Sequence, residues 1–305
     1  MVSRVVFYGS GPVAAASLEQ LSEWCQVEAV ITKPQPPHHK QLFPVIKAAE
    51  RLGLPMHFAS NRHELDELMD SLSFESQAAV LIDYGIIVSQ AVIDKFPLGI
   101  INSHFSLLPE WRGADPISFS ILSGQSETGI SLMLLVQAMD EGPLLAQATY
   151  DLPKDITTPQ LTTDLIDLSN RTLEQILPIY LAGQIQPMPQ ERVARPDHTA
   201  ASYSRKLSKA DSILDSSKPA AQLEREIRAF IEWPRSRTVI AGKDVVVTAA
   251  RAEASPAEHH PGDIYATANK EIALVCNDGQ LVIEKLKPAG KPEMTAAAFL
   301  AGNQL

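Results

Sequence analysis

Short apolar runs alternate with helical patterns through the first 150 residues of the chain. Buried strands are indicated at 5–8, 27–32, 78–83 and 99–104, where each run has a strand's length and is bounded by turn residues. Helices are indicated between them, around 13–23, 43–51, 62–72 and 88–96. This alternation predicts an α/β fold, a Rossmann-like domain whose mostly parallel sheet carries helices on both faces. Two adjacent strands at 128–136 and 143–152 and a long helix at 157–183 complete that domain.

The last third of the chain has a different pattern. A Pro-rich polar stretch precedes one amphipathic helix at 220–231, and five short strands with turn signals follow. Closely spaced short strands predict a small, OB-like β-barrel. We therefore expect an N-terminal domain at 1–190, a linker at 191–204 and a C-terminal β-barrel domain at 205–305.

Composition places the chain among ordinary globular proteins, with 305 residues, 45% of them hydrophobic and 20% charged. Cys25 and Cys276 are too few for a disulfide framework and fit a reducing compartment. The histidine pairs at 38–39 and 259–260 have no nearby set of Cys or carboxylate ligands, so we expect no metal. The opening MVSRVVFYGSG lacks a signal-peptide pattern, and no apolar run approaches the roughly 18 residues of a membrane span. We expect a cytoplasmic protein that binds no membrane.

The net charge of −10 is unevenly distributed. Residues 201–305 hold 14 Lys and Arg and 13 Asp and Glu, whereas residues 1–200 hold 12 and 23. An acidic N-terminal domain does not attract a polyanion by its bulk charge, so nucleic-acid binding requires local basic clusters. The asymmetry indicates that the two domains have different partners.

The turn GSG at 9–11, followed by Ala14, has the G-x-G-x-x-A spacing of a dinucleotide site between a strand and a helix. Such a site also needs an acidic residue at the end of the second strand, where this chain has ITK at 31–33. Pro12 also removes one backbone amide from the turn. A structural glycine turn is the favoured interpretation, with NAD binding as the alternative.

The stretch INSHFSLLPEWRGADP at 101–116 ends an apolar strand in polar side chains. Asn102 and His104 lie on one side of that strand, because side-chain direction repeats every two residues. Asp140 follows the next long strand, so the three side chains converge if these strands are neighbours. An amide that stabilises an oxyanion, an imidazole that moves a proton and a carboxylate that orients it favour acyl transfer to a substrate amine. The alternative is structural, with Asn102 capping a turn and a backbone group satisfying His104.

Five motifs carry a resemblance to a known family. They are Asn102-Ser103-His104, Ser106-Leu107-Leu108-Pro109, Trp111-Arg112-Gly113, Thr128-Gly129 and Asp140-x-Gly142. In order and spacing they resemble the 10-formyltetrahydrofolate-dependent formyltransferases. The stretches SYSRKLSKADSILDSSKPAAQLEREIRAFIEWP and KPAGKPEMTAAAFL resemble the C-terminal domain of the branch that acts on methionyl-tRNA. The resemblance covers nearly the whole chain.

The resemblance implies transfer of a formyl group from the co-substrate 10-formyltetrahydrofolate to the α-amine of initiator methionyl-tRNA, for translation initiation. It implies that Asn102 holds the formyl oxygen, that His104 assists proton transfer and that Asp140 orients His104. It implies a folate site formed by Ser106, Leu107, Leu108 and Pro109 and flanked by Tyr84 and Gly85. Neither a metal nor a stable protein partner is implied.

The chain departs from the family pattern where tRNA is bound. The loop TKPQPPHHKQLFP holds only Lys33 and Lys40 and is several residues short. Glu110 and Asp115 stand where a basic and a small residue are usual. Each change reduces attraction for phosphates.

These departures leave two alternatives to the methionyl-tRNA interpretation. The same chemistry on an amino-sugar nucleotide is one, and a non-catalytic folate- or RNA-binding paralogue is the other. If tRNA is the acceptor, we expect the C-terminal domain to supply most of the affinity, through Lys285, Lys287 and Lys291.

Overall fold

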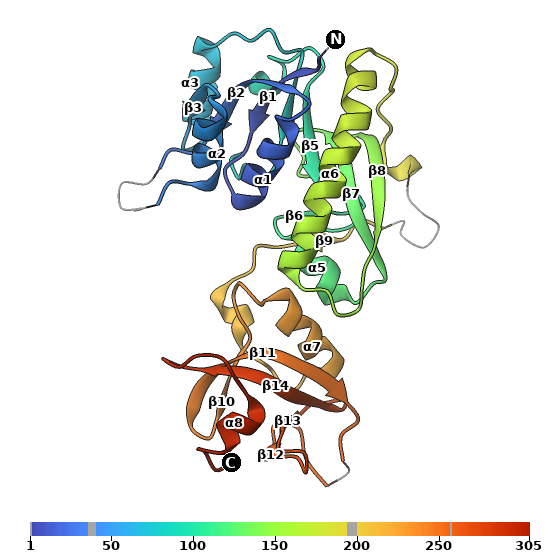
Figure 1. The fold of residues 1–305 in the computed structure, drawn as a ribbon. Coiled ribbons are helices and arrows are strands. Elements are labelled where there is room, and N and C mark those ends of the chain that lie inside the picture. Colours follow the sequence, from blue (N-terminus) through green and yellow to red (C-terminus); the bar gives the residue numbers. More distant parts are fainter. Residues whose placement is uncertain (1, 36–40, 194–199, 257) are drawn as a thin grey trace. The chain divides into compact units, whose positions relative to one another are not determined.

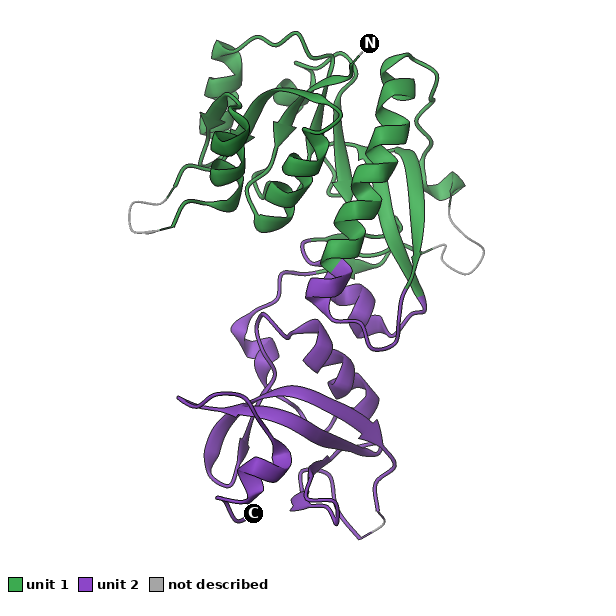
Figure 2. Cartoon of the chain, in the orientation of Figure 1, with its two compact units in different colours: residues 1–113, 127–151, 162–204 green, residues 114–126, 152–161, 205–305 purple. Residues whose placement is uncertain are grey.

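The computed structural model describes residues 2–35, 41–193, 200–256 and 258–305. It divides into two compact units, which are coloured separately in Figure 2. Unit 1 comprises residues 1–113, 127–151 and 162–204, and unit 2 comprises residues 114–126, 152–161 and 205–305. Domain boundaries at 190 and 205 along the chain stay predictions. Part of the expected linker, 194–199, lies outside the described residues.

Unit 1 is built on a seven-stranded sheet with the strand order β3-β2-β1-β4-β5-β7-β8 (Figure 1). The strands are β1 Arg4–Tyr8, β2 Gln26–Thr32, β3 Met56–Phe58, β4 Ala78–Leu81, β5 Ile100–His104, β7 Glu127–Leu134 and β8 Leu144–Asp151. The first five pair in parallel, and β7 and β8 are antiparallel additions beyond β5. The predicted mostly parallel α/β sheet is confirmed.

Helices cover both faces of this sheet, as the sequence predicts. They are α1 Pro12–Leu21, α2 Pro44–Leu52, α3 Arg62–Ser71, α4 Gln90–Ile93 and α6 Thr158–Leu181. Helix α5, Pro116–Ser123, belongs to unit 2, where it contacts α7, Ala220–Ala229. Helix α1 contacts α2, and it also contacts α6 through a hydrogen bond of 2.5 Å from Gln20 to Asp167. Leu65 of α3 and Val92 of α4 share an apolar core with alternate residues of β1, which places these two helices on the opposite face.

Backbone hydrogen bonds within the protein occupy the amides of the turn at 9–11. The N–H groups of Ser10 and Gly11 donate to the Asp83 carbonyl at 3.1 and 3.3 Å. A Cβ on Gly11 would lie 1.7 Å from the Asp83 carboxylate, so a larger residue here would require the Asp83 side chain to move. The amides that a dinucleotide pyrophosphate would require are already engaged, which favours the structural interpretation of this turn.

Unit 2 is centred on an antiparallel sheet with the order β10-β11-β14-β13-β12, and β15 pairs with β14. The strands are β10 Arg237–Ile240, β11 Lys243–Glu253, β12 Ile264–Ala266, β13 Ile272–Val275, β14 Gln280–Pro288 and β15 Met294–Thr295. The sheet curls around helices α7 (Ala220–Ala229) and α8 (Ala296–Leu300), whose Leu223 and Phe299 enter its core (Figure 1). The expected small antiparallel barrel domain is confirmed, in the form of a curled half-barrel.

Asp115, one of the departures from the family pattern, has a structural contact within unit 2. Its Oδ2 accepts a hydrogen bond of 2.7 Å from the backbone N–H of Leu207. The carboxylate thereby links the start of α5 to the segment that begins the C-terminal part of the chain. A glycine or an alanine has no side-chain acceptor and could not make this link.

Candidate active site

The carboxyl end of β5 carries the first two candidate residues. All five residues of β5 are buried. Ser103 turns toward α6, where its Oγ lies 2.7 Å from Ser169 Oγ. Asn102 and His104 therefore face away from α6, because neighbouring strand residues point to opposite sides. Strand β7 lies beside β5 as expected, with Ser131 opposite His104.

Asn102 combines burial with an unused amide. The residue is 8% exposed, and none of the described residues hydrogen-bonds to its side chain. Its amide atoms are not among the fully buried side-chain atoms that lack a hydrogen-bond partner, so solvent or a substrate can reach them. An amide left in this state at the end of a strand is a donor available to a substrate oxygen.

His104 lies between two oxygen atoms. Its Nε2 lies 3.0 Å from the Trp111 carbonyl, which can only accept, so Nε2 is the donor. Its Nδ1 lies 3.8 Å from Asp140 Oδ2. That same oxygen accepts a hydrogen bond of 2.8 Å from the Gly113 N–H. The structure thus brings His104 and Asp140 together, and one backbone segment contacts both.

Asp140 lies in the loop between β7 and β8, beyond the last residue of β7. Its φ is +53°, in the left-handed region that Asp tolerates better than most residues. Two residues later the chain passes so close to β7 that a Cβ on Gly142 would lie 1.7 Å from the Leu134 carbonyl. The D-x-G spacing therefore has a physical reason: the glycine lets the loop close tightly against the strand.

Replacing Gly142 by alanine is predicted to displace this loop. The added Cβ meets backbone, which cannot move aside cheaply, so we expect a loss of about 1–3 kcal/mol of stability together with reduced activity. Urea unfolding and steady-state kinetics measure the two effects. Gly302→Ala is the control, since no atom lies within 4 Å of the Cβ it adds. A Gly142→Ala protein as stable and active as the Gly302→Ala protein would contradict this account.

Ser106–Pro109, the candidate folate segment, forms a buried and fully braced turn. Ser131 of β7 braces it twice: its Oγ accepts from the Leu108 N–H at 2.9 Å and donates to the Ser106 carbonyl at 2.7 Å. Gln147 of β8 donates to the Leu108 carbonyl at 2.8 Å. Leu107 and Leu108 are 6% and 2% exposed, so both side chains are packed inside. The segment presents a rigid wall rather than exposed leucines.

The two flanking candidates lie in a turn that follows β4. Tyr84 is 1% exposed and packs edge-to-face on Tyr8, with ring centroids 5.5 Å apart. Burial raises the pKa of the Tyr84 hydroxyl above its usual value. Its ring therefore belongs to the core, and only its backbone can border a ligand. Gly85 is exposed, has a φ of +67°, and accepts a hydrogen bond of 3.0 Å from Lys33 Nζ through its carbonyl.

Two large apolar side chains are exposed in the same loops. Ile87 is 71% exposed and follows the 83–85 turn, and Met139, which precedes Asp140, is 69% exposed. Apolar side chains beside a few polar groups are typical of sites that bind planar organic ligands.

Several supporting residues are absent from the sequence-based prediction. Trp111 and Gly113 act through backbone groups, and Ser131 and Gln147 brace the folate segment from neighbouring strands. Ser202 lies in the stretch expected to be a linker, and Gln190 directly precedes that stretch. The motif Trp111-Arg112-Gly113 is a signal for the first two, whereas no pattern in the sequence points to the others.

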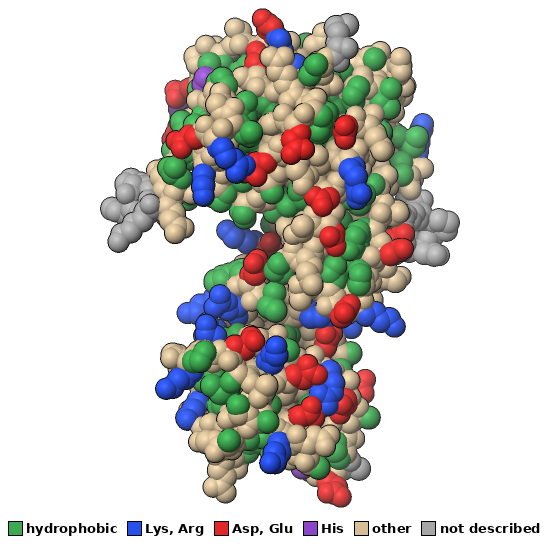
Figure 3. Space-filling view, viewed as in Figure 1, with side chains coloured by type: hydrophobic (Ala, Val, Ile, Leu, Met, Phe, Trp, Pro, Cys, Tyr) green, Lys and Arg blue, Asp and Glu red, His purple; other side chains and the backbone are tan. Residues whose placement is uncertain are grey.

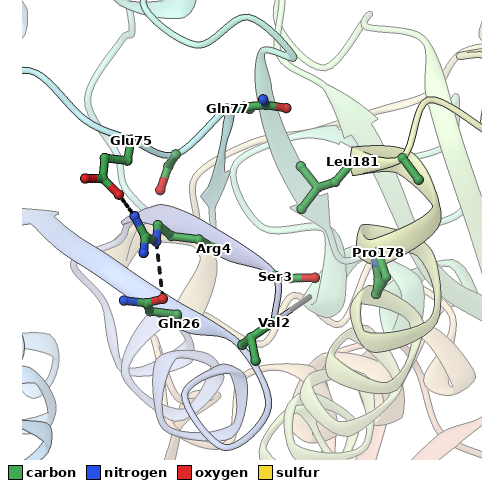
Figure 4. Close-up of a pocket in the computed structure, with 10 residues that line it drawn as sticks. Val2, Ser3, Arg4, Gln26, Glu75, Gln77, Pro178 and Leu181 are labelled. Atoms are coloured by element: carbon green, nitrogen blue, oxygen red, sulfur yellow. Dashed lines mark hydrogen bonds and ion pairs between the residues drawn. The ribbon is translucent and has the colours of Figure 1, made fainter.

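A cavity of about 820 Å³ lies at the opposite end of the sheet (Figure 4). Residues at the starts of β1 and β2 line it, and Arg4 hydrogen-bonds to Gln26 and pairs with Glu75 there. The candidate catalytic residues do not line this cavity, because they lie at the carboxyl ends of the strands.

Within the described ranges, no three His, Cys, Asp or Glu side chains group as a metal site. His259 instead stacks on Tyr265, with ring centroids 4.0 Å apart, and the histidines at 38–39 lie outside the described residues. None of the helices in the described part of the chain is long and apolar enough to cross a bilayer.

Neither serine next to the catalytic candidates is set up as a nucleophile. Ser103 Oγ pairs with Ser169, and Ser106 Oγ donates to the Glu110 carbonyl at 2.5 Å. A side-chain amide and an imidazole–carboxylate pair without an activated neighbouring serine are the groups expected of a group-transfer enzyme whose nucleophile is the acceptor substrate.

The chain belongs to the formyl transferase family. Residues 3–177 match the formyl transferase domain, and residues 206–304 match the family's C-terminal domain. Methionyl-tRNA formyltransferase from Roseiflexus castenholzii is 36% identical over 312 residues, which cover 100% of this chain and 97% of that protein. Methionyl-tRNA formyltransferase from Halorhodospira halophila is 37% identical over 310 residues, 100% of this chain and 98% of its own.

Solved structures share the fold at low sequence identity. The N-formyltransferase from Helicobacter canadensis, in complex with folinic acid and dTDP-3-aminofucose, has a TM-score of 0.68 at 16% identity and covers 93% of this chain and 99% of its own. HypX from Aquifex aeolicus, in complex with tetrahydrofolic acid, has a TM-score of 0.61 at 16% identity, covering 98% of this chain and 47% of its own.

Proposed function

We propose that this chain transfers the formyl group of 10-formyltetrahydrofolate to the α-amine of initiator methionyl-tRNA in the cytoplasm. The main support for the proposal is that the chain is 36–37% identical, along its whole length, to methionyl-tRNA formyltransferases. This similarity includes the C-terminal domain. The sugar-modifying relative shares the fold at only 16% identity. The acceptor is therefore assigned from the full-length relatives.

In the proposed reaction the acceptor amine attacks the formyl carbon, the bond from that carbon to the folate nitrogen breaks, and the amine proton passes to the departing nitrogen. Asn102 donates from its unpaired amide to the formyl oxygen as negative charge develops there. His104 assists the proton transfer, and Asp140, 3.8 Å from Nδ1, holds the imidazole in place. We propose these three roles together with the acceptor.

For folate binding we propose the braced turn Ser106–Pro109 as one wall and the backbone of Tyr84 and Gly85 as the other. The exposed Ile87 and Met139 support this placement, because a planar heteroaromatic ring needs apolar surface beside polar anchors. No metal has a part in this proposal.

For tRNA binding we propose the outer face of the unit 2 sheet. Arg237 of β10, Val246 of β11 and Lys287 of β14 lie directly opposite one another across three strands, and Lys285 lies two residues before Lys287 on the same face. Lys291 follows in the turn after β14. Figure 3 shows Lys and Arg gathered over part of unit 2, with Asp and Glu over other parts. We call Arg237, Lys285, Lys287 and Lys291 the basic row.

Neutralising three members of the basic row is predicted to weaken tRNA binding and flatten its salt dependence. In the variant Lys285→Gln/Lys287→Gln/Lys291→Gln, each lost phosphate contact removes about one unit from the slope of log K against log salt. The kcat and the KM for folate stay unchanged. The control is Lys47→Gln/Arg62→Gln/Lys95→Gln, which removes the same charge from unit 1. Equal salt slopes for the two triple variants would remove the basic row from the proposal.

The acceptor is tested by offering the purified protein 10-formyltetrahydrofolate with either charged initiator tRNA or a dTDP-amino sugar. We expect rapid formylation of methionyl-tRNA and background rates with the sugar. Efficient formylation of the sugar alone would replace the proposed acceptor. Failure with both would favour a non-catalytic paralogue.

A further inference from the structure

The stretch that follows the catalytic domain packs against the candidate site. Met188 pairs with Leu144 at the start of β8 through two backbone hydrogen bonds of 2.7 and 2.8 Å. Residues 203–204 form β9, which pairs in parallel with β6 (Arg112–Gly113). Both contacts lie within unit 1. Residues just before the expected linker and at its end thus contact the start of β8 and the Trp111–Gly113 segment.

Gln190 is the central side chain of the first contact. It is 2% exposed, and its Nε2 donates to two carbonyl oxygens of the Asp140 loop, that of Asp140 at 2.7 Å and that of Gly142 at 2.9 Å. Its Oε1 accepts a hydrogen bond of 2.8 Å from Arg112. Arg112 in turn contacts Glu141 of the same loop at 3.1 Å. The side-chain amide of Gln190 therefore connects the Asp140 loop to the Trp111–Gly113 segment through hydrogen bonds.

Ser202 makes the second contact. Its Oγ accepts from the Trp111 N–H at 2.9 Å, its carbonyl accepts from the Arg112 N–H at 3.0 Å, and its N–H donates to the Pro109 carbonyl at 3.2 Å. These partners extend from Pro109, the last residue of the folate segment, to Trp111 and Arg112, next to the backbone groups that hold His104 and Asp140.

The two contacts converge on the catalytic pair. The Trp111 carbonyl holds His104 Nε2, and the Gly113 N–H holds Asp140 Oδ2. Trp111 and Asp140 both have a φ of +53°, a conformation that persists only where surrounding bonds fix it. Gln190 and Ser202 supply such bonds, one to each segment.

We propose that Gln190 and Ser202 are positioning residues, which hold the Asp140 loop and the Trp111–Gly113 segment so that His104 and Asp140 keep their catalytic geometry. The inference rests on the proposed function of that pair. Neither residue contacts His104, so each acts through the backbone groups it holds. Residues 188–190 and 202–204 are by this inference part of the active site's framework.

The test replaces Gln190 in two ways. Gln190→Met keeps the volume and loses every hydrogen bond, whereas Gln190→Glu keeps an acceptor for Arg112 and loses the donors to both loop carbonyls. We expect kcat for methionyl-tRNA formylation to fall about 10–100-fold in both, because a displacement of about 1 Å at a catalytic group has effects of that size. The KM values for folate and tRNA stay within about twofold, as neither substrate loses a contact.

The control is Gln280→Met, the same substitution at a buried glutamine of β14 that is 6% exposed. It reproduces the loss of buried hydrogen bonds and leaves kcat unchanged. Ser202→Ala, which removes the acceptor for the Trp111 N–H, is expected to lower kcat with KM unchanged, as the Gln190 variants do.

A spectroscopic measurement at fixed pH separates this inference from the proposed function. The ring ¹⁵N resonances of His104 move in both Gln190 variants, while those of the exposed His63 do not. This readout is independent of the acceptor, so it supports the positioning role even if methionyl-tRNA proves not to be the substrate. A wild-type kcat in Gln190→Met, or His104 resonances that stay in place, would overturn the inference.

Discussion

Replacing His104 by alanine should lower kcat for formylation by about 10²–10⁴-fold, the usual contribution of a positioned acid–base group. The imidazole is 6% exposed and lies between the Trp111 carbonyl and Asp140, so alanine removes the proton-transfer group. The folate turn is braced independently through Ser131, and the KM for folate should stay within about twofold. Steady-state kinetics over both substrates measure this split.

His57→Ala provides the matched control. His57 lies in β3 of the same sheet, where its ring packs at the edge of Phe74, and the substitution costs only packing. We expect it to lower the unfolding midpoint with kcat unchanged. If His104→Ala turned over at the wild-type rate, His104 would have only the structural role that the sequence left open, a ring satisfied by a backbone carbonyl.

The strand-level prediction succeeded where local patterns carry the information. The apolar run that ends in Asn102 and His104 forms β5, and the two-residue repeat correctly places both side chains on one face with Ser103 on the other. The neighbouring position of β7, a condition for the expected convergence, is confirmed. A continuous apolar run of strand length bounded by turn residues is a local signal, so the sequence alone indicates a buried strand of this kind.

The support of the site could not be predicted in this way. The sequence identifies about 184–206 as polar and Pro-rich, yet Ser202 hydrogen-bonds to the backbone at Trp111 and Gln190 to that at Asp140. Hydrogen bonds between segments this distant in sequence follow no period, so composition cannot show them. Tyr84 is a related case: the resemblance points to its turn, but only the fold shows that its ring is directed into the core.

Removing the Asn102 amide should lower kcat by about 10²–10³-fold and leave KM nearly unchanged, the pattern for a donor that acts in the transition state. The amide has no partner among the described residues, so its substitution breaks no hydrogen bond that they make with it. We expect Asn102→Ala to fold with wild-type stability. Asn102→Asp should be at least as slow, because its carboxylate cannot donate and repels an oxyanion.

Ser103→Ala is the control that decides between chemistry and strand integrity. Ser103 lies between the two candidates on the same buried strand, but its hydroxyl pairs with Ser169 on the α6 side. If damage to β5 caused the loss of activity, Ser103→Ala would reproduce it with reduced stability. If the amide acts on the reacting group, Ser103→Ala keeps its kcat while Asn102→Ala loses it. A normal kcat with a raised KM in Asn102→Ala would instead mean that Asn102 binds substrate without stabilising the transition state.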